Sequence, residues 1–325
     1  MRAFLIPGLI LCNLIWSTNP VMGKVLFERF EPIQVAWIRT FGAWLATVTV
    51  LVVIRLRRVG SAEVETPLFY SPPSELPSPA RRRRWSWLFL LGTSAFLFAP
   101  LIAMLGLHRS SAIDNSLIVG LEPLATIGLA ALVLGEKPLR EQGLALVFAV
   151  IGFCLLSGLT WNTLCSGWDG HLVGNLLILT SLLGEAGYSV CFRKLKEPQG
   201  ARRIFASAVT IGAAGLTLVV LGLGALPPLR PFLESPRLLG AALWIGPLGT
   251  AATYLFWMQA LEFASIPMVA LTLFVQPLAG PVWGALFFGE SLSGLRVLGA
   301  FAILLALVLS VKGEFRRSAP SKEFH

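Results

Sequence analysis

Long apolar runs dominate this sequence and limit what it can fold into. About ten windows of roughly 17 to 24 residues carry few charges, and each is long enough for a helix to cross about 30 Å of hydrocarbon. The runs are continuous and lack the alternation of a β-barrel, so we expect helices that satisfy their own backbone hydrogen bonds. The windows are 3–21, 33–56, 85–107, 115–134, 143–159, 172–192, 204–226, 238–260, 266–288 and 295–311.

The composition leads to the same fold class. Of the 325 residues, 55% are hydrophobic and 13% are charged, which is too little charge to cover a water-soluble domain of this size. We therefore predict an all-α polytopic membrane protein with about ten transmembrane helices. The four cysteines show no metal-ligand spacing and are interpreted as small apolar residues of the helices, so no metal site is expected.

The basic residues indicate how the chain crosses the bilayer. If ten spans alternate from a cytoplasmic amino terminus, most of the 26 Lys and Arg residues fall in loops on the inner side. Both termini are therefore predicted to be cytoplasmic, with residues 313–325 as a cytoplasmic tail. The net charge of +9 is interpreted as a topology signal, and no nucleic-acid partner is expected.

One loop differs from the rest of the chain in composition. Residues 59–80 are rich in Pro and Ser and are predicted to be a disordered cytoplasmic tether, which leads into the arginine run Arg81–Arg84 and completes a cytoplasmic loop at 59–84. The arginines are interpreted as an anchor on anionic headgroups, with a regulatory patch as the alternative.

The sequence contains an internal repeat. With Pro123 placed over Pro277, the Gly135-Glu136 pair falls on Gly289-Glu290, and several apolar positions also coincide. A weaker match gives Trp16, Val21 and Lys24 the same spacing as Glu185, Val190 and Arg193. Two halves of about five helices each are therefore predicted, residues 1–160 and 170–312.

An odd number of helices in each half has a consequence for symmetry. The second half enters the membrane upside down relative to the first, which is the inverted-repeat architecture of many secondary transporters. Two nearly equivalent halves around a central cavity allow two nearly equivalent conformations, one open to each side.

The motifs carry a family resemblance. Trp16 to Lys24 follows the pattern W-x4-V-x2-K, Glu122-Pro123 opens an apolar stretch, and Gly-Glu ends two of the runs. Together they resemble the EamA-like carriers of the drug/metabolite transporter superfamily, over residues 3–311. The resemblance implies a carrier for a small metabolite, an amino acid or a related amphiphile, frequently an exporter, in a bacterial inner membrane and without a cofactor.

Glu122 is the first candidate for the transport site. An ionisable group within a membrane span is costly, so it is expected to face the bundle interior or a wet cavity. Pro123 removes a backbone donor and is predicted to kink the helix beside the carboxylate, and Pro277 is its counterpart as a second hinge. We predict that Glu122 takes up and releases a proton as the cavity alternates; the alternative is a structural hydrogen bond between helices, as expected for its repeat mate Gln276.

Glu185 is the second candidate. Tyr188 lies one turn further along the same helical face, and the two are predicted to line the cavity. The alternative is a structural ion pair with Arg193 or Lys194. If both carboxylates line the cavity, the site favours a substrate with a cationic group.

Further cavity residues are predicted from their positions on the spans. Aromatic rings with a few polar groups are typical of sites for small amphiphiles, whereas membrane Trp and Tyr side chains also serve as interface anchors and Asn115 could cap its helix. Lys24 and Arg39 are interpreted as snorkelling structural residues, with binding of a substrate carboxylate as the alternative, and Glu136 and Glu290 as helix-end residues. The further cavity candidates are Trp16, Asn19, Asn115, Ser116, Tyr254, Trp257, Thr272 and Gln276.

The function predicted is a secondary transporter that moves a small-molecule substrate through the lipid bilayer. The alternatives are a membrane-embedded enzyme and a channel. The sequence has no HExxH, GxSxG or Walker-type motif, and its three histidines have no paired spacing, so no enzyme activity is expected. The Pro-containing, aromatic-rich repeats favour a stepwise carrier over an open pore. Whether the chain forms a homodimer is left open.

Overall fold

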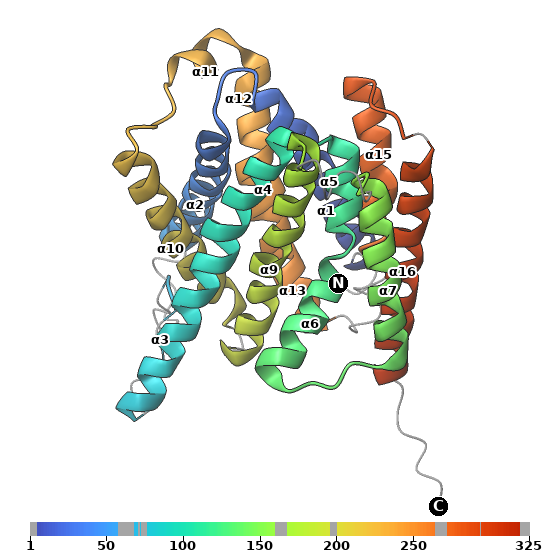
Figure 1. The fold of residues 1–325 in the computed structure, drawn as a ribbon. Helices are drawn as coiled ribbons and strands as arrows, with labels where there is room; N and C mark the ends of the chain where they lie inside the picture. The colour runs from blue at the N-terminus through green and yellow to red at the C-terminus, as the bar shows by residue number, and fades with distance from the viewer. Residues whose placement is uncertain are drawn as a thin grey trace, which may run out of the picture.

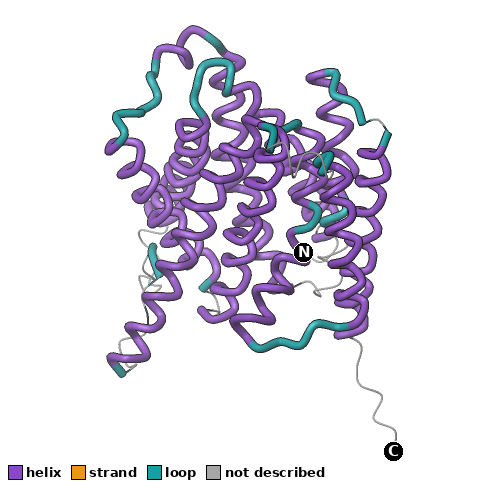
Figure 2. The backbone as a smooth tube through the Cα atoms, in the orientation of Figure 1, coloured by secondary structure: helices purple, strands orange, loops and turns teal. Residues whose placement is uncertain are grey.

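The computed structural model describes residues 5–57, 68–70, 72, 77–159, 168–195, 200–263, 272–292 and 294–318. Every regular element within these residues is a helix (Figure 2), which confirms the all-α prediction for that part of the chain. The elements are α1 (Leu5–Leu26), α2 (Pro32–Arg57), α3 (Ser78–Thr93), η2 (Ser94–Phe98), α4 (Ala99–Arg109), α5 (Ala112–Val119), α6 (Glu122–Leu134), α7 (Arg140–Leu156), α9 (Gly170–Leu195), α10 (Ala201–Gly222), α11 (Arg230–Glu234), α12 (Pro236–Leu243), η3 (Trp244–Ala252), α13 (Thr253–Phe263), α15 (Val275–Phe288) and α16 (Leu295–Ser318).

Seven stretches of the described chain are long and apolar enough to cross a membrane. Two of them continue through π-helical segments, η2 between α3 and α4 and η3 between α12 and α13. Each stretch overlaps one of the windows predicted from the sequence. The stretches are Leu5–Leu26, Pro32–Arg57, Ser78–Arg109, Gly170–Leu195, Ala201–Gly222, Pro236–Ala260 and Leu295–Gly313.

The other three windows correspond to shorter helices. Helices α5 and α6 make one candidate span if they are taken together, α7 has 17 residues and α15 has 14. The beginning of the predicted span 266–288 lies outside the described residues, which resume at Thr272. The described chain therefore has seven or eight candidate spans, and the count of ten stays a prediction.

The window 115–134 is not one kinked helix, as the sequence suggested, but two helices. Helix α5 ends at Val119, α6 begins at Glu122, and their axes differ by 42°. Pro123 explains the new start, because a residue without an N–H cannot continue the hydrogen bonds of α5 but is tolerated in the first turn of another helix. Pro277 lies in the first turn of α15 in the same way. Whether either proline acts as a hinge stays a prediction.

The arginine run is helical, which corrects the predicted extent of the loop at 59–84. Helix α3 begins at Ser78, with Pro79 in its first turn, and includes Arg81–Arg84. Proline suits a first turn and arginine is a good helix former, so the helix starts before the apolar window does. Residues 68–70 are anchored on the bundle, because the Tyr70 backbone N–H donates to Ser207 Oγ at 2.9 Å. Most of the remaining tether lies outside the described residues.

Two helices that the repeat relates end in the same way. Gly135, after α6, has φ 70° and ψ 19°, and Gly289, after α15, has φ 63° and ψ 19°. Both are left-handed conformations, in which glycine avoids the steric penalty of a Cβ. The residue that follows each glycine is a glutamate, Glu136 or Glu290. Figure 1 shows the end of α6 at the bottom of the bundle and the end of α15 at the top.

The helices pack in pairs between the two halves of the chain. Helix α1 packs along α15, α6 along α9, α4 along α9, and α2 against both α10 and η3. Helices α7 and α16 pack together at one side of the bundle (Figure 1). This arrangement brings segments far apart in the sequence, α1, α5, α6, α9, α13 and α15, around a common interior.

Glycines allow the closest of these contacts. A Cβ on Gly152 of α7 would lie 2.9 Å from the Gly299 carbonyl oxygen of α16 and 2.8 Å from the Ile303 side chain. On α15, a Cβ on Gly284 would lie 2.7 Å from Ile113 of α5, and a Cβ on Gly280 would overlap the Ser116 side chain, so both glycines allow close packing of these helices.

We predict that Gly152→Ala lowers the free energy of unfolding in detergent by about 2 kcal/mol, because the added methyl group forces α7 away from α16. The matched control is Gly143→Ala in the same helix, where a Cβ would meet nothing within 4 Å. That variant should be as stable as the wild type or slightly more so, since alanine is the better helix former. Equal melting temperatures for the two variants would show that the α7–α16 contact tolerates a methyl group.

Candidate functional site

A cavity of about 370 Å³ lies in the interior of the bundle. Its walls come from α1, α2, α4, α5, α6, α9, α13 and α15, so both halves of the chain contribute. It is large enough for a small ligand and combines aromatic and polar walls. The predicted cavity residues that line it are Trp16, Asn19, Asn115, Ser116, Glu122, Glu185, Tyr188, Tyr254, Trp257 and Gln276.

Thr272 is the predicted cavity residue that the structure places elsewhere. Its hydroxyl accepts a hydrogen bond from Asn13 Nδ2 at 3.1 Å, within the contact between α1 and the segment before α15. Gln276 lines the cavity but is also tied to this contact, because its Nε2 donates to Asn13 Oδ1 at 2.8 Å. The predicted structural bond at Gln276 is therefore present, and its partner is Asn13 of α1.

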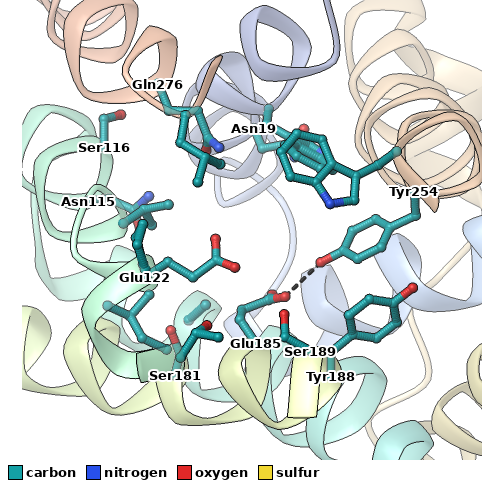
Figure 3. A pocket seen from close by; sticks show the side chains of 18 of the residues that line it. Asn19, Asn115, Ser116, Glu122, Ser181, Glu185, Tyr188, Ser189, Tyr254 and Gln276 are labelled. Carbon is teal, nitrogen blue, oxygen red and sulfur yellow. Dashed lines mark hydrogen bonds between the residues drawn. The ribbon is translucent and has the colours of Figure 1, made fainter. Parts of the chain in front are cut away.

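Glu122 differs from its repeat mate because its carboxylate has no partner. Among the described residues, no hydrogen bond or ion pair involves it, and its side chain is half-buried at the first position of α6. Figure 3 shows the carboxylate extending from α6 into the cavity, beside Glu185 of the neighbouring helix α9. An unpaired carboxylate in such a place is costly unless it is protonated or binds a ligand.

Glu185 is held by a hydrogen bond across the cavity. The Tyr254 hydroxyl of α13 donates to Glu185 Oε2 at 2.6 Å (Figure 3). The alternative considered from the sequence, an ion pair with Arg193, is not formed, because Arg193 pairs with Glu136 instead at 3.1 Å. Glu185 therefore faces the cavity with a fixed orientation, whereas Glu122 is not tied to any described residue.

Aromatic rings form one wall of the cavity. Trp16 contacts Tyr254 edge to face at a centroid distance of 5.4 Å and Trp257 at 5.1 Å. Tyr188 contacts Tyr254 edge to face at 5.6 Å. These contacts join α1, α9 and α13 and fix the rings, because each ring packs against another.

Three buried polar atoms in the cavity wall lack a hydrogen-bond partner among the described residues. They are Trp16 Nε1, Asn19 Oδ1 and the Tyr188 hydroxyl. The Asn19 and Tyr188 side chains are only 8% and 6% exposed. Buried polar groups normally have partners, so these three atoms are unsatisfied groups of the cavity wall in this conformation.

Arg39 lines the cavity, although the sequence favoured a structural role and kept binding of a substrate carboxylate only as the alternative. Its Nε donates to Thr250 Oγ1 at 3.2 Å. No described carboxylate forms an ion pair with it. The signal in the sequence was its position well inside the window 33–56, where a charge is as costly as at Glu122. Ser181 and Ser189 of α9 also line the cavity and had no distinguishing signal.

The charges in the cavity do not balance. Glu136 and Arg193 neutralise each other at one end, which leaves Arg39 against the two carboxylates Glu122 and Glu185. The arrangement suits a ligand that carries a positive charge, or a proton on one carboxylate. Within the described part of the chain, no group of three or more His, Cys, Asp or Glu side chains is placed to hold a metal ion.

A second cluster, outside the cavity, positions α5. Asp114, which is fully buried, pairs with Arg296 of α16 at 2.5 Å and with His171 of α9 at 2.8 Å. Asn175 Nδ2 donates to the same carboxylate at 3.1 Å. This cluster fixes the start of α5 and so the neighbouring Asn115 at the cavity. No sequence pattern distinguished Asp114 from other carboxylates at helix ends.

Comparisons with known proteins give one family model, several relatives and a solved structure of similar fold. The family model described as EamA-like transporter family matches residues 4–158 and 172–312. The uncharacterized transporter YwfM of Bacillus subtilis is 25% identical over 70% of this chain and 74% of its own length. Protein PecM of Dickeya dadantii is 28% identical over 69% of this chain and 73% of its own length. A solved crystal structure with 16% identity covers 98% of this chain and 99% of that chain, with a TM-score of 0.58, and so shares the fold.

We predict that Tyr254→Phe lowers the free energy of unfolding in detergent by about 2 kcal/mol, because it leaves the half-buried Glu185 carboxylate without its donor. The matched control is Tyr188→Phe, which removes a hydroxyl that has no described partner and should change stability by less than about 0.5 kcal/mol. Both are measured by thermal denaturation. If the two variants lose the same stability, the Tyr254–Glu185 bond contributes nothing of its own.

Proposed function

The chain belongs to the EamA-like transporter family, and on that premise we propose that it is a secondary transporter that carries a small amphiphile with a cationic group by alternating access. Relatives named as transporters support the broader statement that it is a membrane transporter. The observation that carries the finer proposal is Glu122, a carboxylate without a described partner, which lies beside Glu185 in a cavity with aromatic walls.

The groups around the cavity support the substrate class. A cationic amine can pair with Glu122, and the faces of Trp16 and Trp257 suit the apolar and cationic parts of such a molecule. The unsatisfied Trp16 Nε1 and the guanidinium of Arg39 offer donors to an acceptor or an acidic group at its other end. An amine or amino acid with an apolar side chain matches all of these groups at once.

Proton coupling is proposed for Glu122 and not for Glu185. Glu185 already accepts a hydrogen bond from Tyr254, which holds its carboxyl group in place. Glu122 has no such bond, so protonation and an incoming cation are alternative ways to neutralise it. If the two exclude each other, a proton that enters from one side displaces a cationic substrate toward the other, which is the logic of an exchanger.

The ten-span, two-repeat arrangement is part of the proposal. Its support is the cross-packing of α1 with α15 and of α6 with α9, together with the matching left-handed glycines Gly135 and Gly289. Each cross-packed pair joins the first helix of one half to the fourth of the other, as an inverted repeat requires. Cytoplasmic termini, a bacterial inner membrane and export as the direction complete the proposal, on the basis of the basic residues and of bacterial relatives.

The test uses proteoliposomes that contain the wild-type chain or Glu122→Gln. A pooled library of amines and amino acids is offered at two internal pH values, and accumulated compounds are identified by mass spectrometry. We expect the wild type to accumulate an amine-containing compound when an outward-directed proton gradient is imposed. Glu122→Gln should lose at least about tenfold of this accumulation, which corresponds to one charge-assisted contact.

The control is Glu28→Gln, which removes a carboxylate from an exposed ion pair with Arg237 and should transport like the wild type. If Glu122→Gln still exchanges substrate across the membrane without responding to pH, Glu122 is the proton carrier. A Glu122→Gln variant that matches the wild type at every pH would contradict the coupling role. Failure of every amine in the library to bind would contradict the substrate class.

A further inference from the structure

Two ion pairs join the halves of the chain at opposite ends of the bundle. Lys24 Nζ of α1 lies 3.0 Å from Glu290 Oε1, just after α15. Arg193 Nη1 of α9 lies 3.1 Å from Glu136 Oε1, just after α6. Glu290 follows the end of α15 at the top of the bundle, and Glu136 follows the end of α6 at the bottom (Figure 1).

The internal repeat converts one ion pair into the other. Lys24 and Arg193 are equivalent positions in the last turns of α1 and α9. Glu136 and Glu290 are equivalent positions directly after the left-handed glycines that end α6 and α15. Each pair therefore joins the first helix of one half to the end of the fourth helix of the other half. The Lys24–Glu290 and Arg193–Glu136 ion pairs are therefore equivalent contacts, one for each copy of the repeat.

The two pairs differ in how firmly they are held. The Lys24 and Glu290 side chains are 23% and 15% exposed, and Glu290 also accepts the backbone N–H groups of Ala112 and Ile113 at 3.0 and 2.9 Å. The Lys24 ammonium also lies 5.6 Å above the ring of Phe288. These contacts close the Lys24 end with several charge-assisted bonds.

The other pair lies at the mouth of the cavity. Arg193 and Glu136 line the cavity, and their side chains are 45% and 33% exposed, whereas Lys24 and Glu290 are not among the lining residues. The cavity in this conformation therefore extends to the Glu136 end, where the intact Arg193–Glu136 pair lies at its edge, and stops short of the Lys24 end. The ion pair with more hydrogen bonds, Lys24–Glu290, therefore lies at the end that the cavity does not reach.

We infer that these pairs are the two gates of the transport cycle: Lys24–Glu290 closes the cavity at one end, Arg193–Glu136 closes it at the other, and the cycle breaks them alternately. The inference rests on the proposed alternating access and adds the residues that decide which side is open. Opening the Lys24 gate also releases the first turn of α5, because Glu290 holds its N–H groups. That turn leads directly to Asn115 and Ser116 in the cavity wall, which connects the gate to the site.

The experiment reads access to the cavity without measuring transport. In a background with the four cysteines replaced by alanine, Ser181→Cys places a thiol in the α9 wall of the cavity. Its labelling by a membrane-impermeant methanethiosulfonate reagent is timed in right-side-out and in inside-out vesicles. One gate is broken by Lys24→Met and the other by Arg193→Met, and the label is detected by mass spectrometry.

We expect opposite shifts from the two variants. Lys24→Met should raise the rate of labelling from the Lys24 side about tenfold relative to the other side, because a half-buried charge-assisted contact is lost. Arg193→Met should shift the ratio the other way by about threefold, since its ion pair is more exposed. The reversed pair Glu136→Arg with Arg193→Glu should restore the original ratio. Shifts in the same direction, or no shift in either variant, would overturn the inference.

Matched controls separate gating from unfolding and from surface charge. Lys24→Arg keeps the ion pair and should label like the parent, while Arg237→Met breaks the exposed pair with Glu28 near the same end and should not change the ratio. Each variant is scored only on folded protein recovered by gel filtration. If the labelling ratio shifts in opposite directions in Lys24→Met and Arg193→Met but no library compound is transported, the proposed substrate class is wrong and the inference about the gates is still supported. Transport with normal pH dependence but no shifts would contradict the gates alone.

Discussion

The cost of an unsatisfied polar group in hydrocarbon governs this structure. A helix avoids this cost because its backbone N–H and C=O groups bond to one another. Where a helix is interrupted, the freed backbone groups must be surrounded by protein or by water. The break between α5 and α6 and the turn before α15 both lie inside the bundle and beside the cavity. Gly120, at the first break, approaches Pro277, at the second, so that a Cβ on Gly120 would lie 3.2 Å from the Pro277 side chain. The irregular backbone and the site therefore share one location.

The same cost explains the charged residues within the membrane region. Asp114 is fully buried and has several partners, Glu185 has the Tyr254 hydroxyl, and Arg39 has Thr250. Glu122 stands apart, because no described group satisfies it. A carboxylate that the described residues leave without a partner is more informative about function than one that they pair, because a ligand or a proton can supply the missing interaction.

The internal repeat places equivalent ion pairs at the two ends of the bundle. The glycines that end α6 and α15 have nearly the same dihedral angles, and the glutamates after them meet equivalent cations on α9 and α1. Identical local chemistry with unequal burial gives one firm and one weak closure. A small difference in free energy between the two ends can then be reversed by a ligand or by a proton, as a two-state carrier requires.

The sequence by itself determined the all-helical membrane class, the pairing of the Gly-Glu positions and the presence of carboxylates inside spans, because apolar runs and misplaced charges are local properties of the chain. All but one of the predicted cavity residues line the cavity that the structure forms, although the sequence could not identify the rest of its wall. Only the tertiary structure decided that Thr272 turns to Asn13, that Arg193 pairs with Glu136, and that Arg39 faces the cavity. Partners from distant helices decide these orientations, and no spacing along one helix specifies which neighbour its side chains will meet.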